Sequence, residues 1–123
     1  MKKIEALADA IAYYCAAHDP TSKAFRNRNP GLLMAISPKH SRDEHGYRVF
    51  ASFVDGYRAL LFDLQVKCSG RSNAKLVPQS TLADLLSAMK YKKGMVDSVA
   101  SYLRKALEDE SISAETPLAY FLE

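Results

Sequence analysis

Arg26-Asn27-Arg28-Asn29-Pro30-Gly31 is the stretch that decides how this chain folds, because it must turn sharply. Proline presets φ near about −65° and glycine tolerates positive φ, so Pro30-Gly31 predicts the centre of a type II turn. The amides of Asn27 and Asn29 can hydrogen-bond either to nearby backbone or to a ligand. A structural corner is the simpler interpretation of this stretch, and ligand contact is the alternative.

The composition is that of one compact domain covering residues 1–123. The chain is 48% hydrophobic and 25% charged, which is enough apolar material for a core. Seventeen basic against fourteen acidic side chains give a net charge of +3, so nucleic acid is not the expected partner. Glu5 and Asp9 interrupt the apolar stretch that an export signal would need, and no run approaches membrane-spanning length. We therefore expect a cytoplasmic protein without membrane association.

Two cysteines, Cys15 and Cys68, are the only thiols of the chain. They form no Cys-x-x-Cys motif and no Cys/His spacing suited to zinc, so neither a metal nor a cofactor is expected. Free thiols are the default in a cytoplasmic protein, but the sequence alone leaves a disulfide between them open.

Apolar residues at helical spacing predict four main helices. The first covers residues 2–17, where Ile4, Ala8, Ile11 and Cys15 lie on one face and Asp19-Pro20 ends the pattern. A central helix follows a Ser52 cap and runs to about Gly70. Further helices are expected from a cap at Ser80 or Thr81 to Met89, over residues 95–108, and as a short last helix with Pro117 at its first position.

Between the turn and the central helix lie two short apolar runs, residues 32–36 and 47–51, separated by ten polar or turn-forming residues. This pattern predicts a small β-hairpin with a long tip, which must pack on helices because two strands cannot support themselves. The expected fold class is therefore α+β and mostly helical.

These motifs, in this order, resemble the phage-associated lysozyme-like family. Its members carry an Arg-Asn-Asn-Asn-Pro-Gly-Asn turn and then a helix beginning roughly Phe-x-(Glu/Asp)-Gly-x-x-Ala-Leu. The matching residues are Arg26, Asn27, Asn29, Pro30, Gly31, Phe53, Asp55, Gly56, Tyr57, Arg58, Ala59 and Leu60, and residues 80–86 and 116–118 also look like the family. The resemblance spans nearly the whole chain and implies a lysozyme-like fold whose cleft faces peptidoglycan.

The resemblance also implies where a catalytic acid should be. In that superfamily a glutamate at the end of the first helix protonates the glycosidic oxygen as the bond breaks. Counting back from the turn at the family's spacing reaches position 15, where this chain has Cys15 followed by Ala16. A thiol is short, is a weak hydrogen-bond donor and has an ordinary pKa near about 8.5, so Cys15 is a poor substitute for the acid.

Other residues could replace the missing acid. Asp19 lies one helical turn beyond Cys15, and Asp43 or Glu44 could supply a carboxylate from the hairpin, although exposed loop charge is the simpler interpretation of all three. Cys15 could also pair with a histidine such as His18 as a nucleophile, but a small buried side chain in the place of glutamate explains it more simply.

Binding residues are expected around the turn: Arg26, Asn27, Arg28 and Asn29, together with Tyr91. Arg28 and Leu32 replace asparagines of the family motif, which makes this rim more basic and more apolar. We expect a degenerate lysozyme-like domain that binds peptidoglycan or a phage or host protein, with virion association as an alternative location. The alternative function is an active peptidoglycan glycosidase that uses a non-standard carboxylate such as Asp19. The oligomeric state is left open.

Overall fold

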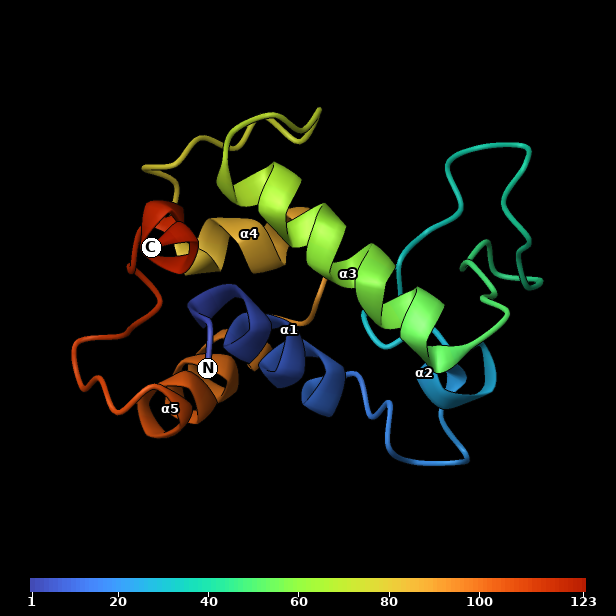
Figure 1. Ribbon diagram of the computed structural model, residues 1–123, viewed down its shortest axis with the longest axis horizontal. Coiled ribbons are helices and arrows are strands. Elements are labelled where there is room, and N and C mark those ends of the chain that lie inside the picture. Colours follow the sequence, from blue (N-terminus) through green and yellow to red (C-terminus); the bar gives the residue numbers. More distant parts are fainter.

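The computed structural model describes residues 1–123 and is mostly helical, as the sequence predicts (Figure 1). The elements are α1 (Lys3–Tyr14), α2 (Lys23–Arg26), α3 (Phe53–Cys68), α4 (Leu82–Ala88), α5 (Met95–Ala106) and the 3-10 helix η1 (Leu118–Leu122). Helix α1 lies in the middle and packs against α3, α5 and η1. The segment between α2 and α3 extends at one end of the molecule, away from both termini.

Helix α1 supplies much of the core. Its residues Ala6, Leu7, Ala10 and Ile11 are fully buried. They belong to a cluster of 19 buried residues that also includes Leu60 and the rest of the apolar faces of α3, α4, α5 and η1. The small alanines allow neighbouring helices to approach α1 closely, so the helix can be surrounded on several sides.

The starts of α3 and α4 agree with the predicted caps. The Ser52 hydroxyl accepts a hydrogen bond from the Asp55 backbone at 3.1 Å. Thr81 and Asp84 form a reciprocal capping box, with each side chain bonded to the backbone N–H of the other. These caps satisfy amide groups that the first helical turn leaves without a partner.

The helix ends differ from the prediction, because α1 stops at Tyr14 rather than near Ala17. Every α-helix ends in the same way. A residue of left-handed conformation lies two positions beyond the last helical residue, and the backbone N–H of the residue after it donates to the carbonyl oxygen five residues earlier. The left-handed residues are Ala16, Arg28, Gly70, Lys90 and Glu108. Only one of them is glycine, so the usual sequence signal for a helix end is missing at the other four.

The predicted hairpin is only weakly formed. Its two arms pair at the single bridge between Met34 and Tyr47, and a second bridge joins Arg42 to Arg48 within the returning segment. Few backbone bonds hold the arms, among them that from Arg48 N to Leu33 O at 2.9 Å. The segment is therefore an irregular loop with β-like contacts.

The turn is present, but its predicted type II geometry is wrong. Leu32 N donates to Asn29 O at 3.1 Å across Pro30-Gly31, yet Gly31 does not have positive φ. Glycine is required there for space instead, because a Cβ at Gly31 would lie 2.5 Å from the Leu60 side chain. The left-handed conformation falls on Arg28 and Leu32, the two residues that flank the turn.

Two further differences concern short elements. The four-residue helix α2, capped by Ser22, is not signalled by periodicity because it spans a single turn. The last helix is a 3-10 helix, and Pro117 is its N-cap rather than its first helical residue. Leu118 and Phe121 of η1 are buried against the chain's own helices, so the apolar C-terminal segment docks intramolecularly.

Candidate functional site

The surface has a groove of about 1250 Å³, hereafter the large groove. It is lined by residues 14–15, 31–34, 36, 47–48, 74, 88–92, 94–95 and 98, together with Ala59, Phe62, Asp63 and Lys67 of α3. The turn and the irregular hairpin therefore form one wall, and α3 with the segment that connects α4 to α5 forms the other. The end of α1 lies between the two walls.

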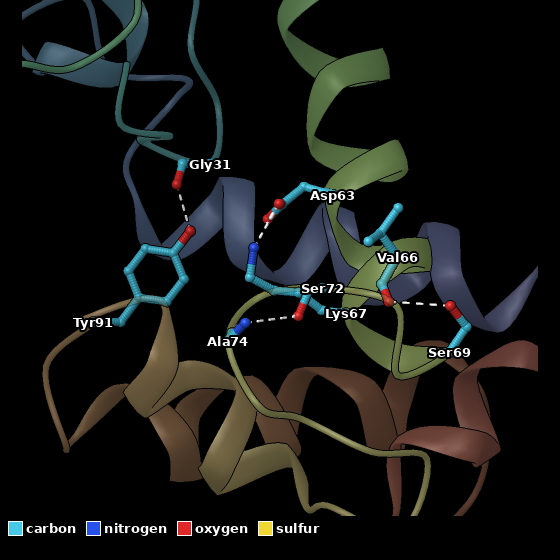
Figure 2. Close-up of polar contacts among 8 residues, drawn as sticks. All are labelled: Gly31, Asp63, Val66, Lys67, Ser69, Ser72, Ala74 and Tyr91. Atoms are coloured by element: carbon cyan, nitrogen blue, oxygen red, sulfur yellow. Dashed lines mark hydrogen bonds and ion pairs between the residues drawn. The ribbon is translucent and has the colours of Figure 1, made fainter. Parts of the chain in front are cut away.

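Cys15, the C-cap residue of α1, lies in this groove beside Tyr91. The Tyr91 hydroxyl donates to Gly31 O, the carbonyl of the sequence-predicted turn (Figure 2). The Cys15 thiol lies beside the same hydroxyl, and the two groups affect each other's pKa. Tyr91 therefore lies next to both the end of α1 and the turn.

Both members of the Cys15–Tyr91 pair hold their protons strongly. Burial raises the pKa of the Cys15 thiol to about 11, against a smaller opposing effect of the Tyr91 hydrogen bond. Burial also raises the pKa of Tyr91 well above its usual value, and the neighbouring Cys15 adds to that. Neither group can donate or accept a proton readily near neutral pH. No histidine lines the groove, so the conceivable Cys/His nucleophile pair is not formed.

The carboxylate in the large groove is Asp63, which sequence reasoning missed. Asp63 and Lys67 lie one turn apart on α3 and form an ion pair of 2.5 Å, opposite Tyr91 (Figure 2). The second carboxylate oxygen of Asp63 is buried and has no hydrogen-bond partner. In the sequence this pair is indistinguishable from the many i, i+4 pairs on solvated helix faces.

The three acidic candidates from the sequence do not lie in the groove. The Asp19 carboxylate accepts hydrogen bonds from the backbone N–H and the hydroxyl of Thr21 at 2.9 and 2.8 Å, and these bonds lower its pKa. Asp43 accepts a hydrogen bond from the Asn27 amide nitrogen at 2.8 Å and two more from backbone N–H groups of the hairpin tip. These bonds also lower its pKa. Glu44 is exposed, 3.4 Å from His45. The two aspartates therefore stabilise local turns as carboxylates.

The two asparagines of the turn are structural. Asn29 is completely buried: its amide nitrogen donates to Leu33 O and Arg48 O at 2.9 and 3.0 Å, and its amide oxygen accepts from Leu33 N at 2.9 Å. Asn27 is also buried. Its side-chain amide nitrogen donates to Asp43, and its backbone carbonyl oxygen accepts from Phe50 N. A structural role therefore accounts for the Asn29 amide and for the Asn27 amide nitrogen, and a binding role for these two residues stays a prediction.

The two arginines of the turn face a different depression, of about 1050 Å³, hereafter the aromatic groove. Arg26 and Arg28 are exposed there, and Arg28 reaches Phe50 O at 3.2 Å. Rings of Tyr13, His18, Phe25, Phe53, Tyr57 and Tyr102 line the same groove. Of the five predicted binding residues, only Tyr91 therefore lies in the large groove.

The two motifs that suggest the family contact one another. Gly56, in the first turn of α3, packs directly against the turn: a Cβ at this position would lie 2.0 Å from Arg28 O and 2.9 Å from Pro30 Cδ. The sequence gives no sign of this contact, because residues 32–52 separate the motifs. The pairing of the motifs in the sequence therefore has a steric reason.

Comparisons with protein-family models, with curated proteins and with solved structures found no match for this chain. No cluster of three or more His, Cys, Asp or Glu side chains is arranged to hold a metal ion. Both cysteines are free, and no helix combines the length and the apolar character needed to cross a membrane. Any functional assignment therefore has to be argued from the grooves themselves.

Proposed function

We propose that this chain is a lysozyme-like domain, akin to the phage-associated family its motifs resemble, that has lost glycosidase activity and acts by binding in the large groove. Its partner is peptidoglycan or a phage or host protein. The observation that carries the proposal is Cys15: the position that the resemblance gives to the family's acid lines the large groove, and it holds a thiol beside Tyr91.

The chemistry of the groove supports binding over cleavage. Glycoside hydrolysis needs a carboxylic acid that can protonate the leaving oxygen. Cys15, with its pKa raised to about 11, keeps its proton at neutral pH, and Asp63 is used as a carboxylate by its ion pair with Lys67. The groove thus contains one carboxylate, which accepts hydrogen bonds, and two groups, Cys15 and Tyr91, that hold their protons tightly. It contains no group that releases a proton readily near neutral pH.

A glycosidase that uses another carboxylate is the second candidate. One observation favours it: Asp63 lies in the large groove and has an oxygen without a partner, whereas Asp19 lies outside both grooves. If the chain cuts glycan strands, Asp63 is therefore a better catalytic candidate than Asp19.

Hydrolysis of purified cell walls separates the two functions. The wild type should release no soluble fragments, and Asp63→Asn and Asp19→Asn should behave identically to it. Release by the wild type that disappears in Asp63→Asn would establish the glycosidase. Cys15→Glu places a carboxyl in the groove beside Tyr91, and a gain of hydrolysis in that variant alone would show that the groove lacks only its acid.

A further inference from the structure

The walls of the large groove are apolar, with a rim that projects into solvent. Ile36, Phe62 and Met34 are 88%, 67% and 48% exposed. Met89 and Met95 continue the apolar lining deeper in the groove. Aliphatic and thioether side chains give the hydroxyls of a sugar no hydrogen-bond partner, whereas flexible methionines adapt well to the apolar side chains of a protein.

The charges of the groove have one predominant sign. Arg48, Lys67, Lys90 and Lys92 line it, against the single carboxylate of Asp63. The Lys67 ammonium is mostly buried and has three N–H donors, one of which is used by Asp63. The remaining donors and the other cations favour an occupant with carboxylates beside its apolar face.

The size of the groove suits a helix. An α-helix is about 10 Å across with its side chains, so a volume of about 1250 Å³ corresponds to roughly three helical turns. An added β-strand is less suitable, because the hairpin wall is held by isolated bridges and has no regular edge to extend.

We infer that the large groove binds an amphipathic, acidic α-helix of a protein partner. The apolar face of that helix packs on Met34, Phe62 and Met89, and its carboxylates meet Lys67 and the cations at the rim. This inference rests on the proposed binding function and chooses a protein over peptidoglycan as the partner.

The probe is a fluorescein-labelled amphipathic peptide of about 15 residues, with leucine and isoleucine on one face and glutamate on the other. Its matched control carries lysine in place of every glutamate. Fluorescence anisotropy with the wild-type protein should show the acidic peptide binding at least about tenfold more tightly than the basic one. Equal affinity, or no binding of the acidic peptide, would overturn the inference.

Exposed substitutions then locate the site without disturbing the core. Phe62→Ser and Lys92→Glu, both in the groove, should each weaken the acidic peptide about fivefold or more. The matched controls Phe53→Ser and Lys39→Glu lie outside it and should leave the affinity unchanged. If the groove variants bind as well as the controls, the peptide binds elsewhere and the inference fails.

Co-sedimentation with cell walls distinguishes this failure from failure of the proposed function. If the cell walls retain the protein but are not cut, and the acidic peptide does not bind, the inference of a helical partner fails. The proposed loss of hydrolysis then stands. If the wild type hydrolyses the walls and also binds the acidic peptide tightly and selectively, the proposed loss of hydrolysis fails. The inference of a helical partner is then supported.

Discussion

The turn at residues 26–31 and the large groove beside it share Gly31, but they use polar groups in opposite ways. In the turn, the amide of Asn29 is fully hydrogen-bonded inside the protein. In the groove, an oxygen of Asp63 has no partner and Lys67 has donors to spare. Fully satisfied polar groups fix a fold, whereas unsatisfied ones in a groove are available to a ligand. The difference teaches that the motif that best suggests the family is a structural one.

The strongest way to break the turn is Gly56→Ala. The added Cβ would overlap Arg28 O, a backbone atom that cannot move aside, so unfolding should become easier by at least about 3 kcal/mol. Gly94→Ala is the matched control, because nothing lies within 4 Å of its Cβ position. Urea denaturation followed by circular dichroism measures both, and equal stability of the two variants would show that the motifs do not pack as described.

Asn29→Ala should have the next largest effect. It leaves Leu33 N and Arg48 O without their partner in a buried site and removes one of two bonds to Leu33 O, which should cost about 2 kcal/mol of unfolding free energy. The exposed Asn73→Ala serves as its control and should stay within about 0.5 kcal/mol of the wild type. A ligand-binding role for Asn29 would instead show as lost binding at unchanged stability.

The groove can be tested through the reactivity of Cys15. Since burial raises its pKa to about 11, little thiolate exists at pH 8. The scarcity of thiolate outweighs its greater nucleophilicity, so alkylation by iodoacetamide should be about tenfold slower than in the urea-unfolded chain. Mass spectrometry of the Cys15 peptide follows the rate, which should climb up to about pH 11. A plateau near pH 7 would mean an activated cysteine instead.

The smallest effect on stability is expected for Asp63→Asn. This substitution tests a polar group of the groove, as Asn29→Ala tests a polar group of the turn. Asparagine keeps an oxygen that can accept a hydrogen bond from the Lys67 ammonium, so the loss should be below about 1 kcal/mol. Glu123→Gln, which removes the surface ion pair with Lys3, gives the reference scale. Thermal unfolding measures both, and a loss as large as that of Asn29→Ala would make Asp63 a structural residue.

Sequence reasoning predicted the helical character and the starts of α3 and α4, because apolar periodicity and the Ser52 and Thr81 caps are local signals. It misplaced the end of α1, because Ala16 takes the left-handed position that glycine usually marks.

The site was predicted less well than the fold. The spacing argument led to Cys15, and Cys15 does line the large groove. Tyr91 was also among the predicted residues, but Asp63 and Lys67 were not, because only the packing of α3 shows that they face a groove rather than open solvent. The separation of Arg28 from Tyr91 into different grooves likewise depends on tertiary structure, which no local pattern encodes.

The central claim is that the large groove binds without cutting. The most direct test is the release of soluble muropeptides from purified peptidoglycan by the wild-type protein, measured by mass spectrometry after long incubation. No release above the buffer blank is the predicted result, since Cys15 holds its proton and Asp63 is ion-paired with Lys67. Steady release in proportion to protein concentration would contradict the claim and would make this chain an enzyme.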